Sequence, residues 1–386
     1  MANYPTYKLG DVAEIILGQS PESKSYNTKG EGLPFFQGKT EFTDWFPIPN
    51  KWCTEPKKIA EPFDVLLSVR APVGPTNIAK EKCCIGRGLA AIRYADCYKY
   101  VLYYLRSVSK YLESKATGTT FSSISGDTIK NLPIPLPPLA TQHAIVSRIE
   151  TLFAELDKGV EHLRTAQQQI KTYRQAVLKA AFEGCDKFEK IIKHFDVTGG
   201  LTKNSQREKF PVKMPYLRVA NVYYNRLDLS EIKEIGVQES EIKEKLLKKD
   251  DLLFVEGNGS KEQIGRVAIW NGSIENCLHQ NHIIKGRPLG TTLSKFALYY
   301  FISDFGREQI IKVASSTSGL YTLSTEKVRN LNVPACSISE QQRIVAEIES
   351  RLSQAEAVEA SIERALQQAE ALRQSILKKA FNGELE

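Results

Sequence analysis

The two stretches that decide the fold are TQHAIVSRIE at residues 141–150 and EQQRIVAEIE at residues 340–349, which are copies of one pattern. The copies extend to both sides: NLPIP at 131–135 matches NLNVP at 330–334, and LKAAFEG at 178–184 matches LKKAFNG at 377–383. All three matches share an offset of 199 residues, with no insertion between them. The chain is therefore an internal repeat whose matched part has a constant length.

The matched part predicts two long helices. Closely spaced prolines before the first copy, such as Pro135 and Pro138, keep the approach extended, and Thr141 and Ser339 are candidate N-caps. Gly184 and Gly383 are typical C-terminal stops. Apolar residues recur in steps of three and four, which is typical of a coiled-coil seam. The predicted seam residues are Ile145, Ile149, Leu156, Leu163, Ile170, Ile344, Ile348, Ile362, Leu372 and Ile376.

Stripes this long need a partner, and each can serve the other. A helix of about 44 residues is roughly 65 Å long, so the second helix has to run back if the stripes are to pair. We expect an α+β fold in which two globular modules with mixed, strand-rich cores are separated by an antiparallel coiled coil with pseudo-two-fold symmetry. The alternative is that each helix packs on its own module. The expected domains are residues 1–138 (module), 139–184 (helix), 185–335 (module) and 336–386 (helix).

Composition and charge narrow the class of protein. The N-terminus has no signal-peptide pattern and no run reaches membrane-spanning length, so we expect a soluble, cytoplasmic protein without a membrane partner. The seven cysteines show no C-x-x-C spacing and indicate reduced thiols. The net charge of +7 divides into +4, +1, +5 and −3 over the four expected domains. Basic modules and near-neutral or acidic helices favour nucleic acid for the modules and protein for the helices.

Motifs for catalysis or metal binding fail on spacing. Residues 32–40 (GLPFFQGKT) have five residues between the glycines where a phosphate-binding P-loop needs four. Cys277, His279 and His282 lack the further ligands of a zinc site. The only Pro-Pro pair, at 137–138, does not form the loop of an amino-methyltransferase. We therefore expect no catalytic residue, no metal and no cofactor bound by this chain.

Polar and aromatic residues between short strand-like runs are the candidates for DNA contact. Arginine can pair with guanine, asparagine and glutamine with adenine, and lysine or hydroxyl groups with phosphate. The alternative is that these residues form ordinary turns. The candidates are Gln37, Lys39, Thr40, Arg70, Arg87, Arg218, Asn221, Tyr223, Asn258, Ser260, Arg266, His279, Gln280 and Asn281.

Taken together, the chain resembles the specificity subunits of type I restriction–modification systems. The resemblance rests on Leu9-Gly10-Asp11-Val12 with Gly18, on the two junctions, on the helix ends, and on the runs 35–39 and 278–282. The second module departs from the pattern, because it opens with Phe195-Asp196-Val197-Thr198-Gly199-Gly200 in place of L-G-D-V.

The resemblance implies two target-recognition domains that each read one half of a bipartite, asymmetric site in double-stranded DNA. The helices would set the spacer and dock two methylation subunits, and restriction subunits would join that core. S-adenosylmethionine, ATP and Mg²⁺ are expected on those partners. The rival interpretations are a coiled-coil adaptor whose modules bind protein and, more weakly, a self-contained nuclease or methyltransferase.

Overall fold

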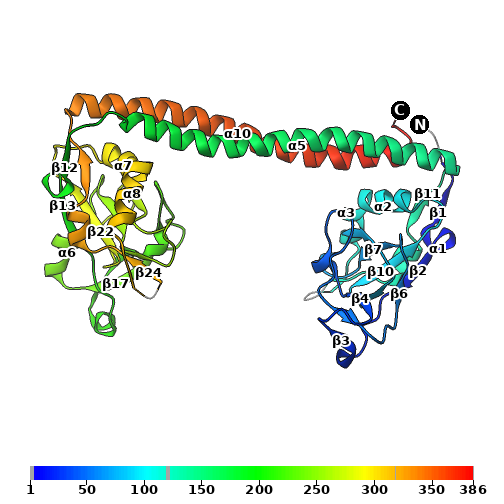
Figure 1. The fold of residues 1–386 in the computed structure, drawn as a ribbon. Coiled ribbons are helices and arrows are strands. Elements are labelled where there is room, and N and C mark those ends of the chain that lie inside the picture. Colours follow the sequence, from blue (N-terminus) through cyan, green and yellow to red (C-terminus); the bar gives the residue numbers. More distant parts are fainter. Residues whose placement is uncertain (1–3, 119–121, 318, 386) are drawn as a thin grey trace. The chain divides into compact units, whose positions relative to one another are not determined.

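The structure is a computed structural model that describes residues 4–118, 122–317 and 319–385. It divides into two compact units. Unit 1 comprises Met1–Arg164 with Glu363–Glu386, and unit 2 comprises Thr165–Ile362. Each long helix, α5 (Leu139–Phe182) and α10 (Ile338–Phe381), therefore contributes one part to each unit (Figure 1). No helix among the described residues is long and apolar enough to cross a membrane.

Unit 1 is built on two sheets. The antiparallel sheet has the order β2-β10-β7-β8, and the five-stranded sheet has the order β3-β5-β4-β9-β6, in which β4 and β9 are parallel. A short pair, β1 with β11, joins the start of the module to its end. The strands are β1 (Thr6–Lys8), β2 (Glu14–Leu17), β3 (Tyr26–Asn27), β4 (Leu33–Phe36), β5 (Trp52–Cys53), β6 (Ile59–Ala60), β7 (Val65–Ser68), β8 (Thr76–Ile78), β9 (Cys83–Ile85), β10 (Leu89–Arg93) and β11 (Pro133–Pro135). The helices are α1 (Leu9–Val12), α2 (Tyr98–Ser107), α3 (Ser109–Ser114) and α4 (Gly126–Lys130), with the 3₁₀ turns η1 (Ser23–Ser25) and η2 (Lys39–Glu41).

Unit 2 repeats the four-stranded antiparallel sheet and the short joining pair, whereas its second sheet has three strands in place of five and two small sheets, β15-β16 and β19-β24-β23, are added. Its antiparallel sheet has the order β13-β22-β18-β20, the sheet β17-β14-β21 contains the parallel pair β14–β21, and β12 pairs with β25. The strands are β12 (Phe188–Lys190), β13 (Phe195–Gly199), β14 (Val212–Leu217), β15 (Val222–Tyr223), β16 (Arg226–Leu227), β17 (Lys233–Val237), β18 (Leu252–Val255), β19 (Gly257–Asn258), β20 (Val267–Ile269), β21 (Leu278–His279), β22 (Ile283–Pro288), β23 (Ser315–Thr317), β24 (Leu320–Thr322) and β25 (Asn332–Pro334). The helices are α6 (Glu239–Lys245), α7 (Ser294–Ile302), α8 (Asp304–Val313) and α9 (Thr325–Arg329), with η3 (Ile191–Lys193), η4 (Ser205–Lys209) and η5 (Val219–Asn221).

A buried acid–arginine pair recurs in the antiparallel sheet of each unit. Asp64 accepts two hydrogen bonds from the Arg93 guanidinium at 3.0 and 2.9 Å, and Asp251 accepts two from Arg287 at 2.9 and 2.8 Å. The carboxylates are 2% and 0% exposed. Each also accepts a backbone N–H three residues earlier in the chain, at 2.8 Å in both units. The pairing raises the pKa of both arginines, Arg93 and Arg287, so both stay charged.

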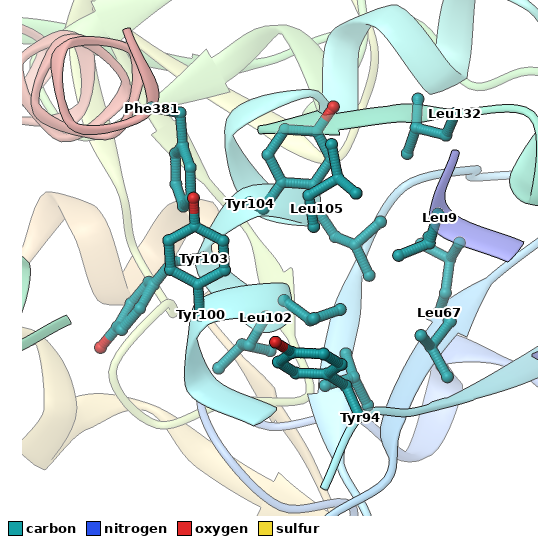
Figure 2. Close-up of a cluster of buried hydrophobic side chains, with 14 of the residues drawn as sticks. Leu9, Leu67, Tyr94, Tyr100, Leu102, Tyr103, Tyr104, Leu105, Leu132 and Phe381 are labelled. Carbon is teal, nitrogen blue, oxygen red and sulfur yellow. The ribbon is translucent and has the colours of Figure 1, made fainter. Parts of the chain in front are cut away.

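The phenylalanine near the end of each long helix is buried in the unit that the helix reaches. In unit 1, the Phe381 ring packs against Tyr100 and Tyr104 on α2, with ring centroids 5.1 and 5.3 Å apart (Figure 2). In unit 2, the Phe182 ring packs against Phe296 and Tyr300 on α7, at 5.4 Å from each. Burying such a ring contributes about 1.5–3 kcal/mol. The matched LKxAF motifs are therefore hydrophobic anchors for the helix ends.

Ion pairs also tie each long helix to the short helix beside it. Lys99 on α2 bonds Glu150 on α5 at 2.7 Å, and Lys295 on α7 bonds Glu349 on α10 at 2.6 Å. A buried glutamine follows each helix start: Gln142 donates to the Pro137 carbonyl at 2.9 Å, and Gln341 donates to the Cys336 carbonyl at 3.0 Å. The sequence repeat therefore extends to individual contacts.

The helix lengths agree with expectation, whereas their first residues and one seam position do not. Both helices have 44 residues, and Gly184 and Gly383 adopt positive φ after them. Thr141 and Ser339 lie inside the helices, because Pro138 fixes the first turn of one and the Ser337 hydroxyl accepts the Glu340 N–H in the other.

Most predicted seam residues are inaccessible to solvent. Leu156 and Leu163 are half-buried. The fully buried ones are Ile145, Ile149, Ile170, Ile344, Ile348, Ile362 and Ile376. The prediction for Leu372 is wrong, since this side chain is 50% exposed. After the buried Ala369, the inward position comes four residues on, at Arg373, which bonds Asp157 and covers the Phe153 ring at 4.9 Å.

Candidate nucleic-acid interface

Three loops of unit 1 meet where strands β4, β7 and β9 end. Because β4 and β9 are parallel and adjacent, the residues that follow them emerge at the same edge. The Gly86 N–H donates to the Phe36 carbonyl at 2.8 Å, and the Gly88 N–H donates to the Gln37 carbonyl at 3.1 Å. The Val69 N–H, just after β7, donates to the Gly88 carbonyl at 2.9 Å. Backbone bonds thus fix the three loops against one another.

Two glycines permit this close approach. A Cβ on Gly88 would lie 2.3 Å from the Gln37 carbonyl oxygen, and a Cβ on Gly18 would lie 2.2 Å from the Gly86 carbonyl oxygen. Real side chains do not come that close to backbone atoms, so only glycine fits at these positions. The Gly86-Arg87-Gly88 run found in the sequence therefore has a packing reason.

The predicted DNA contacts of unit 1 lie together on this edge. A hollow of about 310 Å³ is lined by Gln37, Lys39, Thr40, Arg70 and Arg87, together with residues 68, 71 and 72. All five predicted side chains line this hollow even though the residues are up to 50 positions apart in the sequence. Residues 37, 39, 40 and 87 are exposed to solvent, whereas the glycines between and beside them, Gly38 and Gly88, are less exposed. Among the described residues, no acid lies within salt-bridge distance of Lys39, Arg70 or Arg87. The hollow is therefore a surface of unneutralised positive charge with hydrogen-bonding groups.

The corresponding loops of unit 2 are tied by equivalent bonds. The Gln280 N–H after β21 donates to the Leu217 carbonyl at 2.9 Å, and the Glu256 N–H after β18 donates to the His282 carbonyl at 2.9 Å. A Cβ on Gly200 would lie 2.2 Å from the His279 carbonyl oxygen, just as a Cβ on Gly18 would lie 2.2 Å from the Gly86 carbonyl oxygen in unit 1. The same edge is therefore built in both units.

The arginines of unit 2 are engaged by neighbouring side chains. Arg218 pairs with Glu231 at 3.2 Å and lowers the pKa of that carboxyl group. Two guanidinium groups lie over the Tyr223 ring, with Arg226 at 4.6 Å and Arg266 at 5.2 Å from the ring centroid. The ring orders both cations through cation–π attraction. Unit 2 therefore presents cations in fixed positions.

The remaining predicted residues of unit 2 differ in exposure. Gln280 and Asn281 are partly exposed after β21. Asn258 and Ser260 form a turn in which the Ser260 N–H donates to the Asn258 side chain at 2.9 Å, and the Ser260 hydroxyl donates to Glu262 at 2.6 Å. These bonds use the Asn258 side-chain oxygen and the Ser260 hydroxyl hydrogen.

Two residues that the sequence predicted to contact DNA are buried, so they are left out of the candidate interface. Asn221 is 3% exposed; its side chain accepts the Arg218 N–H and donates to the Asp228 and Glu231 carbonyls. His279 is 0% exposed, and burial lowers the pKa of its ring to about 3, so the ring is neutral. Both side chains stabilise the loops from inside, which an isolated sequence motif cannot distinguish from a surface role.

Sequence reasoning missed three arginines beside aromatic rings. Arg226 stacks on Tyr223, Arg106 lies 5.4 Å from the Trp45 ring, and Arg307 lies 5.1 Å from the Tyr224 ring. Arg106 and Arg307 are on α2 and α8, far in sequence from their rings, so the sequence carried no local signal for them. Arg226 pairs with Tyr223 across the β15–β16 hairpin, and a search for Tyr-x-x-Arg spacing in a hairpin would have found it.

The sequence motifs considered for chemistry serve the fold. Residues 33–36 of the rejected P-loop run form strand β4. Cys277 and His279 are buried, whereas His282 is exposed and bonds Glu256 at 2.7 Å. In the part of the chain that the structure describes, no group of three or more His, Cys, Asp or Glu residues is arranged to hold a metal ion.

Comparisons with known proteins show the family to which the chain belongs. The family model described as type I restriction modification DNA specificity domain matches residues 1–163 and 192–368. The putative type I restriction enzyme MjaX specificity subunit of Methanocaldococcus jannaschii is 40% identical over 175 residues, which cover 44% of this chain and 40% of that relative. The type I restriction enzyme EcoKI specificity subunit of Escherichia coli K12 is 26% identical over 375 residues, covering 90% of this chain and 80% of that relative. A crystal structure of an HsdS subunit from Thermoanaerobacter tengcongensis is 46% identical, covers 40% of this chain and 38% of its own, and has a TM-score of 0.37.

The fold and the family together define a DNA-recognition protein with a mixed α/β architecture. The family model covers well over half of the residues. The chain belongs to the type I restriction–modification DNA specificity family, and its role is DNA sequence recognition, not catalysis.

Proposed function

We propose that units 1 and 2 each carry one target-recognition domain, at residues 1–138 and 185–335, and that each domain reads one half of a bipartite, asymmetric DNA site. The observation that carries the proposal is the repeated loop edge, with its equivalent backbone bonds and its different side chains. Equal scaffolds place the two edges in equivalent settings, and unequal side chains read unequal bases. Salt-dependent phosphate contacts would come from Lys39 and Arg70 in unit 1 and from Arg226 and Arg266 in unit 2.

We further propose that residues 139–184 and 336–386 pair as an antiparallel coiled coil with a pseudo-two-fold axis. The equal helix lengths support this, as do the seven-residue spacing of Ile348, Ala355, Ile362, Ala369 and Ile376 and the anchoring of each helix end in one unit. Contacts such as Asp157–Arg373 and Arg174–Glu359 fit opposite helix directions. The pair would act as a ruler for the unread spacer.

The partners of such a ruler follow from the family. We propose that the helices dock two methylation subunits that carry S-adenosylmethionine, and that restriction subunits using ATP and Mg²⁺ join this core in the cytoplasm. The acidic balance of residues 336–386 supports protein, not DNA, as the partner of the helices.

A module exchange tests the division of reading between the units. Residues 185–335 are replaced by the same module of another family member, and the complex with its methylation subunits is assayed for site preference. Only the half-site read by unit 2 should change, while the other half-site and the spacer stay the same. A change in both half-sites would contradict the proposal.

A matched deletion tests the ruler. Removing residues 160–166 from α5 together with 364–370 from α10 takes one heptad from each helix and keeps the seam in register. The rod shortens by roughly 10 Å, so the spacer should shorten by about three base pairs with unchanged half-sites. Deleting residues 160–166 alone is the control, and it should weaken the complex instead of resetting the spacer.

A further inference from the structure

Arg87 occupies an unusual place on the loop edge of unit 1. It is the only exposed residue between Cys83 and Ile92, where every other side chain or glycine is buried. Its neighbours Gly86 and Gly88 are both held in contact with residue 37, since a Cβ on Gly86 would lie 3.1 Å from the Gln37 Cα atom. A single long cationic side chain therefore projects from an otherwise buried turn.

The backbone that carries Arg87 is fixed from both sides. Gly88 donates to the Gln37 carbonyl of the β4 loop and accepts from the Val69 N–H of the β7 loop, at 3.1 and 2.9 Å. Gly86 donates to the Phe36 carbonyl at 2.8 Å, and the Arg87 N–H donates to the Ser20 hydroxyl at 3.4 Å. The turn is thus the middle of three loops and is the one tied to both of the others.

The guanidinium group of Arg87 is available for a ligand. Among the described residues, it makes no side-chain hydrogen bond and no salt bridge, in contrast to Arg218, which Glu231 engages at 3.2 Å. Lys39 and Arg70 flank it on the outer loops of the same hollow. On a bound duplex this arrangement would let Lys39 and Arg70 contact phosphates while Arg87 reaches a base edge between them.

We infer that Arg87 is a specificity-determining residue that reads a guanine in the major groove of the half-site bound by unit 1. Arginine donates two parallel N–H bonds to guanine O6 and N7, and no other base pair offers two acceptors in that position. The backbone bonds fix the Cα position of Arg87, so its guanidinium can reach only bases close to that point. This inference rests on the proposed function of unit 1.

The test uses the complex of the full chain with its methylation subunits and a duplex library that varies every position of the site. Arg87→Ala should remove the preference for guanine at one position of one half-site by about ten- to hundredfold, with the other positions unchanged. Arg87→Lys keeps the charge without the fork and should lose the same preference while retaining most of the affinity for non-specific DNA.

Lys39→Ala is the matched control, because it removes one positive charge from the same hollow. It should weaken binding to all sequences about equally and leave every base preference in place. If Arg87→Ala behaves like Lys39→Ala, Arg87 contacts phosphate and the inference is wrong. If Arg87→Ala alters a preference in the other half-site, the assignment of unit 1 is wrong. If the wild-type complex prefers no bipartite site, the proposed function itself fails.

Discussion

The loop edges of the two units differ in side chains far more than in backbone. In both units, the first residue after the second parallel strand (Gly86 after β9, Gln280 after β21) donates a backbone hydrogen bond to the last residue of the first parallel strand. In both units, the loop after β7 or β18 donates a backbone hydrogen bond to the same turn. Unit 1 carries Lys39, Arg70 and Arg87 without acid partners among the described residues, whereas unit 2 holds Arg218 against Glu231 and two arginines against Tyr223. The backbone bonds of the loop edge therefore recur in both units, whereas the side chains on it differ.

The difference has an electrostatic consequence. Free cations attract phosphates over a Debye length, so unit 1 should contribute more of the salt-dependent affinity. Cations held by a ring or a carboxylate lose less conformational entropy when they bind, so unit 2 should contribute relatively more through geometry. Substitutions at three places test how far the two units are alike.

The largest expected effect is a loss of stability when the buried acid–arginine pair, which both units contain, is broken. Asp64→Ala in unit 1 leaves Arg93 with the exposed Glu14 as its remaining acid partner, and Asp251→Ala in unit 2 removes the acid partner of Arg287. Each change also leaves one backbone N–H without its side-chain acceptor. Each should lower the free energy of unfolding by about 3–5 kcal/mol, measured by urea denaturation. Glu14→Gln is the control, since Glu14 is an exposed partner of Arg93 and should cost well under 1 kcal/mol. Very unequal losses at the two aspartates would show that the units are not energetically equivalent.

The next largest expected effect is on stability and comes from a buried lysine that only the sheet of unit 2 contains at this position. Lys285 is 1% exposed on β22 of unit 2, whereas the corresponding position on β10 of unit 1 is Ala91; the two pair with Leu253 and Leu66 respectively. Burial lowers the pKa of Lys285 from 10.5 to about 8. Lys285→Met should raise the free energy of unfolding at pH 7 by about 1–3 kcal/mol, because the charged amine no longer has to be desolvated.

The pH dependence of that gain has a definite sign. Between pH 8 and 10.5 the unfolded wild-type chain binds more protons at Lys285 than the folded chain, so wild-type stability at this site rises with pH. The advantage of Lys285→Met should therefore be full below pH 8 and decline as the pH rises toward 10.5. An advantage that stays constant from pH 7 to 10 would mean that Lys285 binds its proton equally well in the folded and unfolded chain, so that folding does not lower its pKa.

The smallest expected effect is a change in non-specific DNA affinity when the loop edge of unit 2 is given a free cation like those of unit 1. Glu231→Gln releases Arg218 in unit 2, giving it a free cation like those of unit 1. The affinity for non-specific duplex should rise about two- to fivefold at low salt, with a steeper dependence on salt concentration. Lys233 is the other neighbour of Glu231, so Lys233→Gln serves as a control that leaves the Arg218 pair intact. Unchanged salt dependence in Glu231→Gln would contradict the view that Glu231 restrains Arg218.

Residue types on the loop edge were predictable to different degrees. The exposure of Gln37, Lys39, Thr40, Arg70 and Arg87 was predictable, because polar residues between strand-like runs of a basic module tend to be exposed. The same reasoning failed for His279 and Asn221, since a polar side chain that satisfies backbone groups inside a loop has the same sequence signature as one on its surface. The seam prediction failed at Leu372, where an arginine one residue on takes the inward position by pairing with Asp157.

The duplication, the two 44-residue helices and the strand-rich modules were predictable from the sequence, because periodicity and turn residues act through neighbours along the chain. Only the tertiary structure decided which loops meet, since the parallel pairing of β4 with β9 brings together residues about 50 positions apart. It also decided that Phe381 is anchored beside α2 and Phe182 beside α7. Hydrophobic burial is non-directional along a sequence, so the partner of a buried ring is fixed only when the chain has folded.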